Sequence, residues 1–209
     1  IDCMPGCPNS VGYHMSGTST LSSERAELNE HNRHASGYCF AWCHLKKAQA
    51  PEEILKGGFV RPEDLGRYEA VGITDFKIDT RVLTTPVILA RARAYAERSY
   101  SGDLKRLLSV FSLAYKTSRG TQMGGGGEAE TSLKFFELAR HVDFAELLHF
   151  PNEKLDGFLK HFVSAPCGLE CGECDYCTAW ANKAMTWDEA HRQKLVEVLK
   201  KYREWLLNR

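Results

Sequence analysis

The middle of this 209-residue chain carries strand-like and helix-like patterns of apolar and polar residues. Residues 54–60 have apolar pairs at both ends and are a short strand candidate, and residues 73–79 alternate apolar and polar positions, which predicts a strand. Between them, Pro62 in a first turn and Gly72 as a stop predict a helix over about 62–70. A strand, a helix and a strand with short connections predict a parallel pair with a right-handed crossover.

The remainder of the chain has mainly helical periodicity. Thr85 as a cap and Pro86 in the first turn predict a helix to about Tyr100, and Asp103 is predicted to cap the next one. Other helical patterns cover 23–31, 38–48, 130–141, 143–149, 152–164 and 178–185, with a glycine-rich loop over 118–128.

The last helix has the clearest pattern. A capping box of Thr186 and Glu189 is predicted to begin it. Its apolar positions fall on one face, which we expect to be buried: Leu195, Val198, Leu199, Tyr202, Trp205 and Leu206.

Charge and composition narrow the class of protein. Lys and Arg together number 27 and so do Asp and Glu, so the net charge is zero. This balance argues against a general binder of nucleic acid or membrane surfaces, although a local basic patch remains open. A hydrophobic share of 43% indicates a globular fold, and the chain has no apolar run of the length that a membrane span needs.

The eight cysteines form two groups of four. One group is Cys3, Cys7, Cys39 and Cys43, and the other is Cys167, Cys171, Cys174 and Cys177. Two metal sites with four thiolates each explain this grouping, while disulfides and unliganded thiols are the alternatives. A chain of this length does not need disulfides for stability, so we expect metal binding in a reducing, cytoplasmic setting.

The second group has the spacing C-x3-C-x2-C-x2-C and so lies within eleven residues. Four thiolates this close in sequence wrap one tetrahedral centre with little loss of chain entropy. The spacing is tighter than that of zinc ribbons and the motif contains no histidine, which favours a [4Fe–4S] cluster over zinc. Zinc is the alternative.

The first group is looser, because 31 residues separate its two pairs. A second cluster on this group requires the fold to bring Cys3 and Cys7 to Cys39 and Cys43. The pairs are otherwise separate buried thiols. Nearby histidines, including His14, are alternative ligands.

Catalytic candidates are fewer. Asp79 and Arg81 stand where a predicted strand ends, a position at which ligands gather in α/β sheets, and a structural ion pair explains them equally well. His14 is a third candidate. The sequence contains no Ser–His–Asp order and no H-E-x-x-H motif, so hydrolysis has no positive support.

Several segments of the chain carry a resemblance to a known family. They are Asp2-Cys-Met-Pro-Gly-Cys-Pro8 with His14, Asn32-Arg33 before Cys39 and Cys43, residues 56–65, Phe76-Lys-Ile-Asp-Thr-Arg81, residues 94–98, residues 155–158 and the terminal cysteines. Together these segments resemble the peptidase U32 family. The resemblance implies a (β/α)8, or TIM-type, barrel. It also implies a [4Fe–4S] cluster on Cys3, Cys7, Cys39 and Cys43, and oxygen-independent hydroxylation of a cofactor precursor or RNA.

On this basis the chain is expected to be the C-terminal part of an α/β barrel with a helical, cysteine-rich extension. Residues 1–82 would supply the terminal βα units, 83–165 a helical segment, and 166–209 the metal motif and the last helix. An upstream barrel half or a partner subunit would complete the fold. The predicted function is that of an iron–sulfur redox or hydroxylation enzyme, with a zinc-stabilised module or a peptidase as alternatives.

Overall fold

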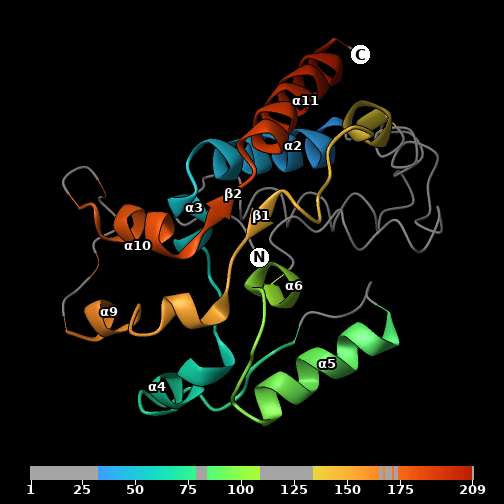
Figure 1. The fold of residues 1–209 in the computed structure, drawn as a ribbon. Helices are drawn as coiled ribbons and strands as arrows, with labels where there is room; N and C mark the ends of the chain where they lie inside the picture. The colour runs from blue at the N-terminus through green and yellow to red at the C-terminus, as the bar shows by residue number, and fades with distance from the viewer. Residues whose placement is uncertain are drawn as a thin grey trace.

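The computed structural model describes residues 33–78, 84–108, 134–164, 167, 171 and 174–208, with the backbone alone for residues 33–40. Within this part the chain is mainly helical and contains one two-stranded sheet (Figure 1). The two strands predicted within residues 1–82 are not strands among the described residues, and the barrel expected from the sequence stays a prediction.

Two long helices pack side by side and form one end of the molecule: α2 (Arg33–Gln49) and α11 (Glu189–Leu207) (Figure 1). The predicted buried face of α11 is confirmed: Leu195, Val198, Leu199, Tyr202 and Leu206 are buried, and Trp205 is partly buried. Helix α2 is longer than the predicted segment 38–48.

Arg192 of α11 joins the two helices. Its Nε donates to the carbonyl oxygen of Ala48 at 2.6 Å, and its Nη2 donates to that of Gln49 at 3.1 Å. These carbonyls belong to the last turn of α2, where an α-helix leaves acceptors without intrahelical donors. A cation at this end also interacts favourably with the helix dipole.

The cap of α11 differs from the prediction. Asp188 is the N-cap residue, and its carboxylate accepts a hydrogen bond from the His191 backbone N–H at 2.9 Å. Thr186 belongs instead to the short strand β2 (Thr186–Trp187). The expected capping box was therefore wrong, because strand pairing holds Thr186 away from the helix terminus.

Residues 52–69 are helical where the sequence predicted a strand first. Helix α3 (Glu52–Leu55) is followed by a loop, then by the 3-10 helix η2 (Pro62–Asp64) and α4 (Leu65–Glu69). The strand over 54–60 was wrong, because Gly57 and Gly58 end α3 in a turn. The helix after Pro62 is confirmed, and Gly72, at a φ of 88°, ends it.

Residues 73–78 form no strand in the described part of the chain, so the strand predicted over 73–79 is not found there. The expected parallel partner is absent because residues 54–60 are not a strand. Ile73 keeps 45% of its surface exposed, and Val71 keeps 75%.

The next helices follow the predictions more closely. Helix α5 (Thr85–Ala96) begins at Thr85, with Thr84 rather than Thr85 at the cap position and Pro86 in the first turn. Helix α6 (Leu104–Leu108) follows Asp103, whose carboxylate accepts from the Lys105 backbone N–H at 2.9 Å. Residues 134–139 are helical within the predicted segment 130–141.

Two predicted helices were wrong in the segment before the cysteines. Residues 143–149 form turns and the strand β1 (Leu148–His149), which pairs antiparallel with β2. The predicted helix over 152–164 is broken into the 3-10 helix η3 (Asn152–Leu155) and α9 (Lys160–Ser164). Gly157, at a φ of 91°, stands between them and breaks the helical path.

Buried polar contacts fix this segment to the middle of the chain. Asn152, which is almost fully buried, donates through Nδ2 to Glu63 Oε1 and to the carbonyl oxygen of Tyr100, both at 2.8 Å. The Asp103 carboxylate also accepts from the Phe150 backbone N–H at 3.1 Å. These bonds hold η3 and the following aromatic residues beside η2.

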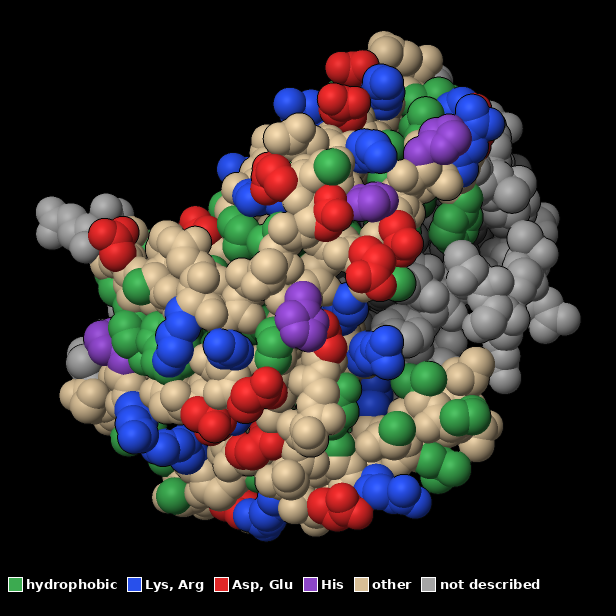
Figure 2. All heavy atoms as spheres, viewed as in Figure 1, with side chains coloured by type: hydrophobic (Ala, Val, Ile, Leu, Met, Phe, Trp, Pro, Cys, Tyr) green, Lys and Arg blue, Asp and Glu red, His purple; other side chains and the backbone are tan. Residues whose placement is uncertain are grey.

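Acidic and basic side chains alternate in small groups over the face shown in Figure 2. This distribution matches the zero net charge of the chain. None of the described helices is long and apolar enough to cross a membrane.

Candidate functional site

The helix α10 (Tyr176–Ala184) positions the end of the cysteine motif. It covers residues 178–184 of the predicted helical segment 178–185 and begins two residues earlier, so Cys177 lies in its first turn. Ala181 and Ala184 are buried, and these small side chains allow α10 to pack closely on α3 and η3. The N-terminus of a helix favours negative charge, which suits a thiolate at this position.

The four thiols of the motif have different environments. Cys167, Cys171 and Cys174 are exposed, while Cys177 is half-buried against the core. The pKa of Cys177 is raised to about 11: burial is the largest cause, Lys56 lowers this pKa, and the charges of Cys171, Cys167 and Cys174 raise it. Cys177 therefore lies close enough to the other three thiols to be influenced by their charge.

The four cysteine thiolates of this motif are ligands suited to a soft metal ion. Thiolate sulfur is the ligand of zinc and of iron–sulfur clusters, whereas magnesium and calcium require oxygen ligands. Among the described residues, no three Cys, His, Asp or Glu side chains converge on one point in a way that would hold a metal ion. Cys177 would have to lose its proton on binding, and a metal ion promotes that loss.

Lys56 lies just after α3, as the C-cap residue of that helix. Its ammonium forms an ion pair with Glu53 at 2.8 Å, and both side chains are mostly buried. The pKa of Lys56 is raised overall: burial is the largest single influence and lowers it, but Glu53 and, after it, Cys171 together raise it by more. Lys56 is thus a cation beside the cysteine motif.

Aromatic side chains border the motif, and we call Phe158, His161, Phe162, Tyr176 and Trp180 the aromatic cluster. Tyr176 is its centre: its ring stacks on His161 with centroids 4.2 Å apart and on Phe158 with centroids 5.7 Å apart. The Tyr176 hydroxyl donates to the Phe158 carbonyl oxygen at 2.7 Å. The cluster fixes α10 to the η3–α9 segment and stands directly before Cys177.

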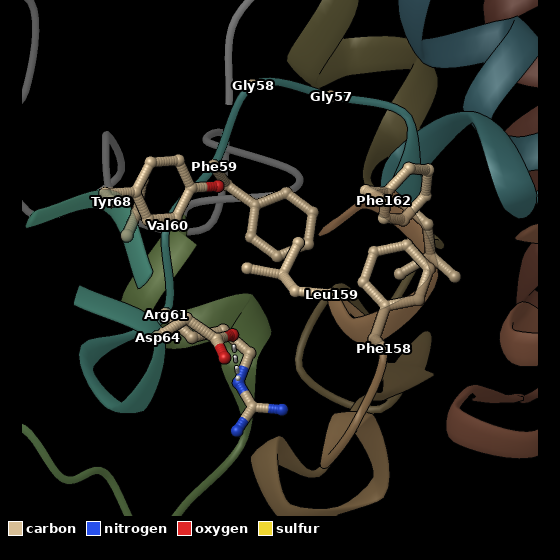
Figure 3. A pocket seen from close by; sticks show the side chains of 11 residues that line it. Gly57, Gly58, Phe59, Val60, Arg61, Asp64, Tyr68, Phe158, Leu159 and Phe162 are labelled. Atoms are coloured by element: carbon tan, nitrogen blue, oxygen red, sulfur yellow. Dashed lines mark ion pairs between the residues drawn. The ribbon is translucent and has the colours of Figure 1, made fainter. Parts of the chain in front are cut away.

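A pocket of about 220 Å³ adjoins the aromatic cluster (Figure 3). Phe158, Leu159 and Phe162 line one side of it, and Phe59 and Tyr68 line another. Arg61 and Asp64 add a charged end to the pocket. The glycines at 57 and 58 lie at the end opposite the Arg61 guanidinium (Figure 3).

Arg61 is the most buried charged group of the pocket, with 3% of its side chain exposed. Its Nη2 donates to Asp156 Oδ1 at 2.7 Å, and its Nε lies 3.5 Å from Asp64 Oδ2. Burial raises the pKa of Asp64 above its usual value, and the charges of Arg61 and then Arg67 oppose this rise. Arg61 therefore stabilises a half-buried carboxylate.

The first cysteine group is only partly described. Cys39 and Cys43 both belong to α2, four residues apart, so the predicted helical placement of this pair is confirmed. Cys43 is half-buried. Cys3 and Cys7 lie outside the described residues, as do the catalytic candidates His14, Asp79 and Arg81. Their assembly into a site stays a prediction.

Sequence reasoning missed the pocket. Arg61 and Asp64 stand three residues apart beside Pro62, a spacing typical of an ion pair in a helical turn. Nothing in that local pattern indicates that the guanidinium is buried or that Asp156, 95 residues away, completes the pair.

The comparisons with known proteins give one distant relative. The chain is 26% identical over 149 residues to a protein of Methanocaldococcus jannaschii named "Uncharacterized protease MJ1657". The match covers 71% of this chain and 35% of the relative, so the chain spans about a third of that protein's length. A comparison with models of protein families finds no match, and neither does one with solved structures. These findings establish a distant link to a protease-named protein.

Proposed function

We propose that the cysteine motif over 167–177 binds a [4Fe–4S] cluster and that the protein is a redox enzyme or a subunit of one. One observation carries this proposal: four cysteines lie within eleven residues, and the last of them, Cys177, is half-buried in the first turn of α10. An iron–sulfur cluster supplies one-electron transfer when it is bound. Zinc is the alternative occupant of the same thiolates.

A second cluster is proposed for Cys3, Cys7, Cys39 and Cys43. The described part of the chain supports half of this set, because α2 places Cys39 and Cys43 one helical turn apart. The family resemblance assigns the other half. Two thiolate centres would require a reducing compartment, so we propose the cytoplasm as the location.

The substrate is proposed from the resemblance to U32 proteins: a cofactor precursor or an RNA base, modified by hydroxylation or a related redox step. His14, Asp79 and Arg81 are the proposed catalytic residues. We also propose that an upstream barrel half or a partner subunit adjoins residues 73–78. The alternation of apolar and polar residues over 73–79, which is typical of a strand, supports this assignment.

Replacing both Cys171 and Cys174 with alanine is expected to remove one metal centre. After anaerobic purification, the double variant should lose roughly four iron atoms and four sulfides per chain relative to the unaltered protein. Both side chains are exposed, so the substitutions remove no buried surface and the fold should survive. The measurement is iron, acid-labile sulfide and zinc analysis together with a circular dichroism melt.

The matched control is the double variant of Cys39 and Cys43, which should leave the centre on Cys167–Cys177 intact. If each double variant loses all metal, the two groups are not independent centres. Zinc without acid-labile sulfide in the unaltered protein would refute the iron–sulfur proposal and support the zinc-stabilised module.

Peptide hydrolysis is the second candidate, because the distant relative has a protease name. We expect the purified protein, with its metal restored, to release no products from a mixture of unstructured peptides. Mass spectrometry of the mixture is the measurement. Cleavage that disappears in a His14→Asn variant would replace the redox proposal with a peptidase.

A further inference from the structure

Lys56 is a mostly buried cation whose ion pair uses only part of its hydrogen-bonding capacity. Its side chain is 19% exposed, and its ammonium donates to Glu53 Oε1 at 2.8 Å. An ammonium has three N–H donors. Within the described part of the chain Glu53 is its one hydrogen-bond partner, so two donors are available to another acceptor.

The fold brings Lys56 to the helix that carries Cys177. Lys56 directly follows Ile54 and Leu55, the buried residues of α3, and is the C-cap residue of that helix. Helix α3 contacts α10 (Figure 1). Cys177, in the first turn of α10, packs against the core to which Ile54 and Leu55 belong.

Electrostatic interactions between Lys56 and the motif agree with this placement in both directions. Burial is the largest influence on the pKa of Cys177 and raises it, while Lys56 is the next and lowers it. Among the influences on the pKa of Lys56, Cys171 follows burial and Glu53, and it raises this pKa. Lys56 therefore favours the thiolate form, in which a cysteine binds metal ions.

The centre proposed for the motif has an excess of negative charge. Zinc and an oxidised [4Fe–4S] core each carry two positive charges, whereas four thiolates carry four negative charges. Either occupant leaves two net negative charges, and one-electron reduction of the cluster adds a third. Glu170, Glu173 and Asp175 add further acidic residues to the same segment of the sequence. A cation close by lowers the electrostatic cost of such a centre.

We propose that Lys56 supplies positive charge that compensates the thiolates of the motif, and that Glu53 orients its ammonium for this role. The inference deepens the proposed function and rests on it, because it requires a metal centre on Cys167–Cys177. It applies to an iron–sulfur cluster and to zinc alike, since both leave the same net charge. The charge at residue 56, rather than its ion pair with Glu53, then controls the properties of the centre.

Lys56→Met tests this inference through the reduction potential of the cluster. Loss of the cation disfavours the more negative, reduced form. At a fixed potential the ratio of reduced to oxidised cluster should fall at least about threefold, which corresponds to a decrease of about 28 mV in midpoint potential. Anaerobic redox titration followed by visible absorption measures it. Cys39 and Cys43 are replaced by alanine in every sample, so that the first cysteine group contributes no signal.

Glu53→Gln separates the effect of charge from that of structure. Both substitutions remove the Lys56–Glu53 ion pair, but the amide oxygen of the new side chain still accepts a hydrogen bond from the ammonium. Because Glu53→Gln removes a negative charge, the midpoint potential should rise in this variant and fall in Lys56→Met. A purely structural role of the ion pair predicts changes of the same sign. Glu53→Gln also keeps the inference testable if Lys56→Met does not fold.

Two control variants complete the set. Lys56→Arg retains the charge and should leave the ratio of reduced to oxidised cluster unchanged. Lys183→Met removes one positive charge from the last turn of α10, where the exposed Lys183 lies over the Trp180 ring at 3.9 Å. Solvent and salt screen this charge, so the ratio should change by less than about 1.5-fold.

Zinc binding tests the same charge without iron or sulfide. Zinc added to the reduced, metal-free protein is competed against a chromophoric chelator. Lys56→Met should weaken zinc binding at least about tenfold, and Glu53→Gln should strengthen it.

The outcomes distinguish this inference from the proposed function. Changes of the same sign in Lys56→Met and Glu53→Gln, or no change in Lys56→Met, would overturn the role of Lys56 while the metal centre remains. An unaltered protein that binds neither iron nor zinc would overturn the proposed function, and the role of Lys56 with it. Iron, sulfide and zinc analysis of the unaltered protein identifies that case directly.

Discussion

Replacing Leu199 with alanine should lower the free energy of unfolding by about 3 kcal/mol. Leu199 is 0% exposed in α11 and belongs to the core that includes the buried face of α2. The substitution removes buried apolar atoms and leaves a cavity that two packed helices fill only in part. Urea unfolding, followed by circular dichroism, measures the difference.

Leu207→Ala is the matched control on the same helix. Leu207 keeps 66% of its surface exposed, so its truncation should change the free energy of unfolding by less than about 0.5 kcal/mol. Both substitutions exchange leucine for alanine in the same helix, and the helix-propensity change is small beside the expected loss at Leu199, so the difference between them mainly reports burial. Equal losses at the two positions would contradict the packing of α11 on α2.

Replacing Arg61 with methionine should lower the free energy of unfolding by about 3 kcal/mol at neutral pH, the lower end of the range for breaking a buried ion pair. The lower end applies because Asp156, the closest partner, is 70% exposed, whereas Arg61 is 3% exposed. Methionine preserves much of the apolar volume of the Arg61 side chain. The loss in the free energy of unfolding therefore reports the missing charge and hydrogen bonds.

The effect of Arg61→Met should depend on pH through Asp64. Burial already raises the pKa of Asp64 in the folded protein, and loss of the Arg61 charge should raise it further. A carboxyl group with a raised folded-state pKa favours the folded state below its unfolded-state pKa. That contribution disappears as the pH rises through the folded-state pKa. The loss in the free energy of unfolding that Arg61→Met causes should therefore be smaller at pH 4 than at pH 7.

Two further variants test this explanation. Adding Asp64→Asn to Arg61→Met removes the half-buried charge, so the double variant should recover part of the loss at pH 7 and lose the pH dependence. Arg67→Met is the control, because Arg67 is 41% exposed and lies 3.8 Å from Asp64; its loss should stay below about 1 kcal/mol. If Arg61→Met lowers the free energy of unfolding equally at pH 4 and pH 7, Asp64 is not the source of the pH dependence.

Local sequence signals predicted the helices that have strong periodicity or a distinct first turn. The buried face of α11 follows from apolar residues spaced at helical intervals, and α5 follows from a threonine before proline. These signals act within one or two turns of the chain, so the sequence contains all the information they need. The spacing of the second cysteine group, Cys167 to Cys177, is likewise a short-range pattern that the sequence alone contains.

Predictions failed where a distant residue determines the local conformation. Residues 143–149 have a helix-like apolar pattern, but Leu148 pairs with Trp187 across the two-stranded sheet. Short apolar runs fit either a strand or a buried helix, and only the partner decides between them. The predicted strand over 54–60 failed for a local reason instead, because two adjacent glycines end α3.

The sequence by itself determined the two groups of four cysteines, the zero net charge and the buried face of the last helix. Each of these depends on residue type and short-range spacing. Only the tertiary structure showed that Cys177 is half-buried in a helical first turn and that Arg61 is buried at the end of a pocket. Burial and ion pairing depend on segments up to 95 residues apart, and the position of those segments is fixed only when the core packs.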